Sequence, residues 1–208
     1  MILFTDEEFP ENPYPGARPD RSFVHRDGAG YALGTAPGGW RTGRVPVLAY
    51  GSNACPSKIT WLRENLGLGA EPVVVARAEC HGVAAVWAAG LRARDGQRTA
   101  TLAAAPGVTE WHAVWFATPE QVEVLDRCEG RGVRYDLARL RTGRVRLEDG
   151  SVVEDVLTYV GAGPARMPLL VDGAPVRTAD VAQHEAIRLE GTPAGTHGLD
   201  AEPIPLLQ

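Results

Sequence analysis

The sequence predicts an α+β domain in which a mixed or antiparallel sheet closes into a small β-barrel with flanking helices. Two observations favour this class. Most apolar runs between residues 45 and 161 are short and are separated by turns that contain Gly or Pro, as in hairpin-rich sheets. Few helical patterns interrupt these runs, which disfavours the helix-covered parallel sheet of a doubly wound fold.

Two short helices are expected within this region. Pro56 suits the first position of a helix, and apolar residues follow at helical spacing until Gly67 ends it. The second helix follows Thr118, where Thr and a Gln three residues later form a capping box. It is expected to stop near Glu129 and Gly130, because glycine readily adopts the left-handed conformation that ends a helix.

The expected strands are apolar or alternate between apolar and polar residues. A turn is predicted at residues 105–107 and another at residues 148–150, where Gly follows polar or small residues. The turn at 148–150 would connect a hairpin whose return strand begins at residue 152. The predicted strands cover residues 47–50, 72–78, 82–87, 99–102, 111–117, 135–140, 145–147 and 152–160.

The chain divides into three predicted regions. Residues 1–44 are rich in Pro and Gly, which predicts an arm without regular elements. Scattered aromatic residues argue against full disorder, so we expect this arm to lie on the domain surface or on a partner subunit. Residues 45–191 form the predicted domain, with a last helix over residues 178–189. Residues 192–208 are expected to form an irregular tail.

Charge and composition exclude several classes of function. The net charge is -5 and basic residues do not cluster, which argues against nucleic-acid binding. No apolar run approaches the roughly 18 residues that a membrane span needs. The three cysteines are odd in number, and neither they nor the histidines have metal-ligand or redox spacing, so neither disulfides nor a metal site is expected. Without a secretory leader pattern, a cytoplasmic location is expected.

The chain is organised around the loop Tyr50-Gly51-Ser52-Asn53, which joins the strand at 47–50 to the helix that starts at Pro56. A loop in this position leaves backbone N–H groups unpaired near the start of a helix. Such groups bind carboxylates, phosphates or an oxyanion. The same pattern is also compatible with a plain connecting loop, and a second motif further along the chain decides in favour of a site.

Two motifs resemble those of the γ-glutamylcyclotransferase family. Residues 48–53 are similar to the family's Tyr-Gly-Ser-Asn loop. Residues 125–130, Leu-Asp-Arg-Cys-Glu-Gly, with Tyr135 beyond them, resemble its second motif, Leu-Asp-x-x-Glu-Gly followed by Tyr. The motifs occur in the family's order and near its spacing, over roughly residues 46–161. The domain is therefore expected to be γ-glutamylcyclotransferase-like.

The resemblance implies an enzyme that releases 5-oxoproline from a γ-glutamyl amide or a related small-molecule amide. The α-amine of the substrate attacks its own γ-carbonyl, so the reaction requires no metal and no organic cofactor. Glu129 corresponds to the family's general acid/base, and a position at a helix C-terminus together with burial would raise its pKa toward neutrality. The residues implied to bind the substrate are Tyr50, Gly51, Ser52, Asn53 and, as a wall residue, Tyr135.

Other interpretations of the same residues remain open at the sequence level. Glu129 would be solvent-exposed if the helix merely ends there, and Asp126 is expected to orient or cap groups locally. The fold could serve as a non-catalytic module that binds a small metabolite, as an amide hydrolase or acyl transferase, or as an interaction protein that docks through its N-terminal arm. Residues 54–56, Ala-Cys-Pro, depart from the family's bulky apolar residue after Asn53 and are expected to reshape the pocket mouth.

Overall fold

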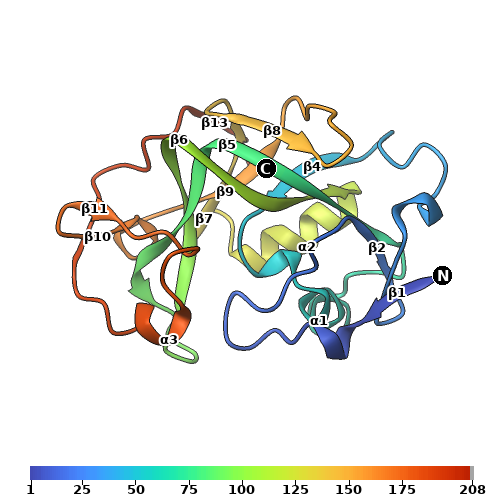
Figure 1. The fold of residues 1–208 in the computed structure, drawn as a ribbon, viewed down its shortest axis with the longest axis horizontal. Helices are drawn as coiled ribbons and strands as arrows, with labels where there is room; N and C mark the ends of the chain where they lie inside the picture. Colours follow the sequence, from blue (N-terminus) through green and yellow to red (C-terminus); the bar gives the residue numbers. More distant parts are fainter. Residues whose placement is uncertain (207–208) are drawn as a thin grey trace.

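The computed structural model describes residues 1–206 and shows an α+β fold built on one large sheet (Figure 1). The sheet has ten strands in the order β1-β3-β2-β5-β6-β4-β9-β7-β13, with β8 paired to β5. Only β4 and β9 run parallel; the other pairs are antiparallel. No pairing among the described residues joins the two ends of this order, so the expected closure into a barrel is not confirmed.

The centre of the sheet is a pair of long antiparallel strands, β5 (Val73–Leu91) and β6 (Arg98–Ala117). The sequence predicts four separate strands and a turn at 105–107 here, and that prediction is wrong. The register shifts between His81 and Val83, where Gly82 has a φ of 78° and residues 105–108 face it as extra residues. The Gly and Pro residues therefore form a bulge within continuous strands.

The first two predicted helices of the domain are confirmed. α1 (Pro56–Leu66) begins at its proline and ends at Gly67 in the left-handed conformation, with a φ of 70°. α2 (Pro119–Glu129) has the expected capping box, in which the Thr118 hydroxyl accepts from the Gln121 N–H at 3.3 Å. It ends at Gly130, which has a φ of 64°. These boundaries are set by local residues, which explains why they could be read from the sequence.

The N-terminal region contains regular strands, contrary to the expectation of an arm without them. β1 (Ile2–Thr5) and β2 (Phe23–Arg26) both pair with β3 (Ala29–Tyr31), and β2 joins the large sheet through β5. The intervening Pro-rich segment is irregular, as predicted, and short 3₁₀ turns occur at Asp6–Glu8 and Leu33–Thr35. Long-range pairing with β5 supplies the order that local sequence does not indicate.

The second half of the domain differs from the predicted hairpin. β8 (Arg144–Leu147) pairs with β5, whereas β9 (Leu157–Gly161) lies between β4 (Val45–Ala49) and β7 (Tyr135–Leu140). A single bridge from Arg146 to Val152 is all that remains of the predicted pairing. Asp155 has a positive φ of 53°, which interrupts the expected strand over 152–160.

The C-terminal elements are shorter than expected. The predicted helix over 178–189 is reduced to α3 (Gln183–Ala186). A separate three-stranded sheet contains β10 (Leu169–Val171), β11 (Ala174–Pro175) and β12 (Thr192–Pro193). The predicted irregular tail contains β12 and also β13 (Ala201–Pro203), which pairs with β7, and its residues 207–208 lie outside the described residues.

Both faces of the large sheet are apolar. Alternate residues of a strand point to opposite faces. Trp115 of β6 therefore belongs to the same core cluster as Ile59 of α1 and Leu125 of α2. Phe116 points to the other face, where its ring centre lies 4.7 Å from that of Trp40. Figure 1 shows α1 and α2 near the N-terminal strands, with α3 and the small sheet at the other end of the molecule. None of the described helices is long and apolar enough to cross a membrane.

Candidate active site

All six residues implicated by the sequence line one cavity of about 350 Å³. Two further 3₁₀ turns contribute to its walls, Ser52–Ala54 after β4 and Pro164–Arg166 after β9. The cavity lies between the loop after β4, the C-terminus of α2, and the connection from β5 to β6. The predicted residues found in its lining are Tyr50, Gly51, Ser52, Asn53, Glu129 and Tyr135.

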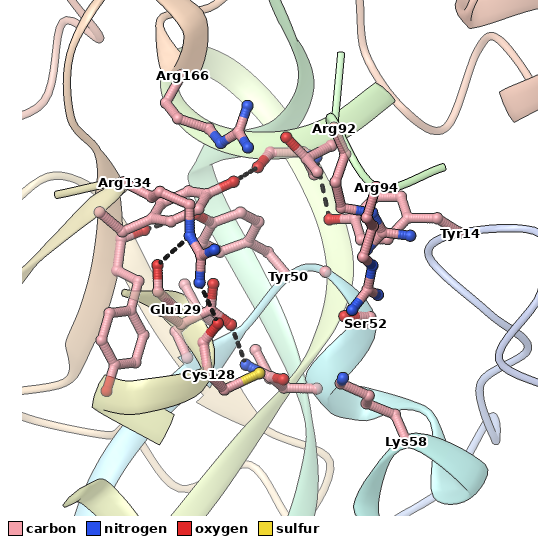
Figure 2. A pocket seen from close by; sticks show the side chains of 18 of the residues that line it. Tyr14, Tyr50, Ser52, Lys58, Arg92, Arg94, Cys128, Glu129, Arg134 and Arg166 are labelled. Carbon is pink, nitrogen blue, oxygen red and sulfur yellow. Dashed lines mark hydrogen bonds between the residues drawn. The ribbon is translucent and has the colours of Figure 1, made fainter. Parts of the chain in front are cut away.

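The side chain of Asn53 connects the two motifs. Its Nδ2 donates a 2.7 Å hydrogen bond to Oε1 of Glu129 (Figure 2). Its backbone carbonyl accepts a 2.8 Å hydrogen bond from the indole N–H of Trp115, which is buried in the core. The loop is therefore fixed at one residue both to the sheet and to the candidate acid/base.

The loop also keeps backbone donors available. Among residues 1–206, the N–H groups of Gly51, Ser52 and Asn53 have no protein acceptor at hydrogen-bond geometry. Unpaired N–H groups next to a helix N-terminus favour negative charge. This part of the cavity can therefore hold a carboxylate or a developing oxyanion.

Glu129 is the last residue of α2, and the end of the helix determines its position. Gly130 adopts the left-handed conformation, and Arg134 donates to the backbone carbonyls of Cys128 at 2.7 Å and of Glu129 at 3.1 Å. A Cβ added at Gly130 would lie 2.9 Å from Nε of Arg134, so glycine also permits this close approach. Arg134 thus satisfies helix-end carbonyls that would otherwise be unpaired.

The pKa of Glu129 is raised above its ordinary value, in the direction that the sequence predicts. Burial of the carboxyl in the cavity is the main cause, because it disfavours the ionised form. The hydrogen bond from Asn53 and the positive charges of Lys58, Arg134 and Arg166 oppose it without cancelling it. A carboxyl with a raised pKa can both accept and return a proton near neutral pH.

Two tyrosines hold one wall of the cavity through Ala100 of β6. The Tyr135 hydroxyl donates to the Ala100 carbonyl at 2.9 Å, and the Ala100 N–H donates to the Tyr14 hydroxyl at 3.0 Å. The Tyr50 hydroxyl donates to the Tyr159 carbonyl at 2.5 Å. The predicted residues Tyr50 and Tyr135 therefore contact the protein through their hydroxyls and present mainly ring surface to a ligand.

Tyr14 is a site residue that the sequence analysis did not find. It reaches the cavity from the Pro-rich N-terminal segment, and a Cβ added at Gly51 would lie 2.8 Å from its hydroxyl oxygen. Gly51 is therefore required for close packing of the loop against Tyr14, since its φ of -114° does not itself demand glycine. No local signal in a Pro-rich segment identifies such a residue.

The positively charged lining was also missed. Lys58, Arg92, Arg94, Arg134 and Arg166 all line the cavity, against Glu129 as the single acidic residue of the lining. Lys58 is the only lysine of the chain and lies three residues after Cys55. That isolated occurrence beside the loop motif is the one sequence signal that could have indicated a functional role.

Residues 54–56 anchor the N-terminal segment and are absent from the cavity lining. Cys55 is fully buried, and its thiol donates to the carbonyl of Phe9 at 3.3 Å. Burial raises its pKa, which opposes thiolate formation. That this departure from the family reshapes the pocket mouth stays a prediction; Tyr14, which does line the cavity, follows in the segment that Cys55 holds.

The remaining polar groups limit the possible chemistry. Asp126 accepts from the Tyr159 hydroxyl at 2.7 Å and from Arg131 at 2.8 Å, so it has the local orienting role expected from the sequence. The lining contains no histidine that could activate Ser52 as a nucleophile. No group of three His, Cys, Asp or Glu residues among residues 1–206 is arranged to hold a metal ion.

Comparisons with known proteins find similarity only among solved structures. No protein-family model matches the chain, and no curated protein matches it by sequence. A structure described as gamma-glutamyl cyclotransferase is 18% identical, with 57% of this chain and 67% of that chain covered at a TM-score of 0.46. An uncharacterized protein from Homo sapiens is 18% identical, with 58% and 68% covered at a TM-score of 0.45.

A third structure, from Arabidopsis thaliana, is 22% identical, with 60% of this chain and 75% of that chain covered at a TM-score of 0.41. Each of these likenesses covers 57–60% of this chain at a TM-score below 0.5, so neither a family nor an activity follows from it. The function is argued from the motifs and the site.

Proposed function

We propose that this protein is a γ-glutamylcyclotransferase-like enzyme that releases 5-oxoproline from a γ-glutamyl amide. The observation that carries the proposal is the hydrogen bond between Asn53 and Glu129 across the cavity, with the pKa of Glu129 raised by burial. This arrangement brings a proton carrier next to a loop that offers unpaired backbone N–H groups. An amide aminolysis needs both of these groups within reach of one carbonyl.

The reaction begins when the substrate's α-ammonium loses a proton to the carboxylate of Glu129. The free amine attacks the γ-carbonyl carbon, and a five-membered ring forms as the new C–N bond is made. The carbonyl oxygen becomes an oxyanion, for which the N–H groups of Gly51 and Ser52 are available donors. Because both reactants belong to one molecule, most of the entropic cost of bringing them together is avoided.

The tetrahedral intermediate then collapses by breaking the bond to the leaving nitrogen. Glu129 returns its proton to that nitrogen and then takes the second proton from the attacking nitrogen and passes it to the released amine. The products are therefore 5-oxoproline and an ammonium, and no water is consumed. One carboxyl therefore serves both proton transfers, which requires a pKa between those of an ordinary carboxylic acid and an amine. The half-buried position of Glu129 beside several cations is compatible with this requirement.

The direct test is release of 5-oxoproline from a panel of γ-glutamyl amino acids and amines. Wild type should release it from at least one member, and Glu129→Gln should reduce kcat by about 10²–10⁴-fold, as expected for loss of a general acid/base. Glu123→Gln is a matched control, because Glu123 is an exposed residue of the same helix. Identical traces from wild type and Glu129→Gln with every substrate would refute the proposal.

A further inference from the structure

The cavity carries more positive charge than the proposed reaction needs. Its lining has five cationic side chains and a single carboxylate, that of Glu129. Arg134 caps the end of α2 by donating to backbone carbonyls. Arg92 and Arg94 share a single carboxylate, that of Asp95, at 2.6 Å and 3.6 Å. One charge of this arginine pair, together with Lys58 and Arg166, therefore requires a separate account.

Arg166 is buried in the lining without a charged partner. It is 9% exposed, and its Nε is a buried atom with no hydrogen-bond acceptor among the described residues. Its guanidinium carbon lies 5.8 Å from the centre of the Tyr135 ring. An unpaired, desolvated guanidinium destabilises a folded protein, so its presence in a cavity indicates a site for an anion.

Lys58 is a second buried cation without an ion pair among residues 1–206. It is 5% exposed, and its Nζ lies 3.3 Å from the centre of the Trp61 ring. Burial lowers its pKa, although the charges of nearby Cys128 and Glu11 oppose this. A ring face compensates only part of the hydration that an ammonium loses, so Lys58 also remains available to an anion.

The cations that this accounting leaves lie in two places. Figure 2 shows Arg166 and Lys58 on opposite sides of Glu129, with Arg94 on the side of Tyr14 and Ser52. Arg94 is exposed at 56% of its side chain and lies 5.9 Å from the Trp61 ring that Lys58 also contacts. Lys58 and Arg94 thus form a cationic pair around Trp61 that extends from the interior to the cavity mouth.

A γ-glutamyl amide has one acidic group in its glutamyl part and, where the leaving amine is itself acidic, further acidic groups at its other end. The α-carboxylate of the glutamyl part is common to every such substrate and requires one anion site. The leaving amine is the variable part, and it must extend toward solvent. An ordinary amino acid as leaving group supplies one further carboxylate, which is fewer than the two positive charges that Lys58, Arg92 and Arg94 retain at that end after pairing with Asp95.

We propose that the amine released by this enzyme carries at least two negative charges, as in an amino dicarboxylate or a phosphorylated amine. Arg166 holds the α-carboxylate of the glutamyl part, and Lys58 with Arg94 holds the acidic groups of the leaving amine. This inference rests on the proposed function. It makes Lys58 and Arg94 specificity-determining residues, because the shared chemistry that they recognise is a polyanionic leaving group.

The test compares γ-glutamyl amides whose leaving amines differ in charge: ethylamine, alanine, aspartate and phosphoethanolamine. The ratio of kcat/KM for each of the two acidic amines over alanine should exceed about tenfold in wild type and fall with rising salt. The aspartate and phosphoethanolamine arms distinguish carboxylate from phosphate recognition at similar charge. Arg94→Gln should reduce several-fold the kcat/KM ratio of the better acidic amine over alanine. Arg188→Gln should preserve this ratio, because Arg188 is exposed and is not part of the cavity lining.

Glutaryl analogues separate this inference from the proposed reaction, because they lack the α-amine and cannot cyclise. Titration calorimetry should show that glutaryl-aspartate or glutaryl-phosphoethanolamine binds at least about tenfold more tightly than glutaryl-alanine. Equal turnover and equal binding across the series would overturn the inference while leaving the reaction intact. Preferential binding without release of 5-oxoproline from any amide would refute the proposed reaction, and would assign the cations to a binding site.

Discussion

The amide of Asn53 donates a 2.7 Å hydrogen bond to the carboxylate of Glu129, which lies 76 residues further along the chain. The oxygen of the same amide, Oδ1, is buried and has no hydrogen-bond partner among residues 1–206. This contact joins the end of α2 to the loop that precedes α1. Both the protonation of Glu129 and the position of the loop depend on it.

Asn53→Ala should raise the pKa of Glu129 further. The hydrogen bond favours the ionised carboxyl, so its removal leaves burial less opposed. A bond to a charged group contributes about 1.5–3 kcal/mol, so we expect the acidic limb of the kcat/KM profile to move upward by about one to two pH units. If the acidic midpoint of the kcat/KM profile were the same in Asn53→Ala and wild type, the hydrogen bond would not control the pKa of Glu129.

Glu129→Gln should stabilise the protein at neutral and higher pH. The pKa of Glu129 is higher in the folded than in the unfolded state, so the native state binds this proton more tightly. Its contribution to stability is present below the unfolded pKa and is lost as pH rises through the folded pKa. The Tm of the variant should therefore match wild type near pH 4 and exceed it above pH 7, as measured by thermal unfolding.

Glu123→Gln is the control for this pH dependence, because Glu123 is an exposed residue of the same helix. Its Tm difference from wild type should vary little with pH. A Glu129→Gln variant less stable than wild type at pH 8 would show that the ionised carboxylate stabilises the cavity, and would contradict the raised pKa.

Gly51→Ala should impair the site through a clash with Tyr14. The added Cβ would lie 2.8 Å from the Tyr14 hydroxyl oxygen, while the φ of -114° lies outside the left-handed region that favours glycine. Such overpacking costs about 1–3 kcal/mol, measurable by urea unfolding. The double variant Gly51→Ala/Tyr14→Phe removes the opposing oxygen and should recover part of the loss; strictly additive effects would refute the clash.

Tyr14→Phe and Tyr14→Ala should differ sharply. Phe removes only the acceptor of the Ala100 N–H, which costs about 1–3 kcal/mol when a buried donor is left unpaired. Ala also removes the buried ring, with a cost of about 3–5 kcal/mol and a higher KM because one cavity wall is lost. Urea unfolding and steady-state kinetics together check this order, and equal effects of the two substitutions would contradict it.

Local chemistry explains which parts of the fold could be predicted. The bounds of α1 and α2 follow from Pro56, Thr118, Gly67 and Gly130, whose conformational preferences act within one turn. Gly82 and residues 105–108 look like turns locally, but pairing between β5 and β6 makes them a bulge. The strands before residue 32 depend on β5 in the same way, so the Pro-rich composition alone was misleading.

The residues of the candidate site also differ in whether the local sequence could identify them. Tyr50 to Asn53 and Glu129 belong to contiguous motifs, and the sequence therefore identifies them together. Tyr14, Arg94 and Arg166 come from separate segments that only the fold brings to the cavity. A single arginine on a loop is common on protein surfaces, so nothing in the sequence distinguishes Arg166 from the exposed arginines elsewhere.

The most direct test of the central claim is product analysis of a γ-glutamyl amide turned over in water enriched in ¹⁸O. Intramolecular attack assisted by Glu129 predicts 5-oxoproline without ¹⁸O, released together with an equal amount of free amine, and loss of both products in Glu129→Gln. Glutamate labelled with ¹⁸O in its γ-carboxylate would identify a hydrolase and contradict the account, as would unchanged 5-oxoproline release by Glu129→Gln.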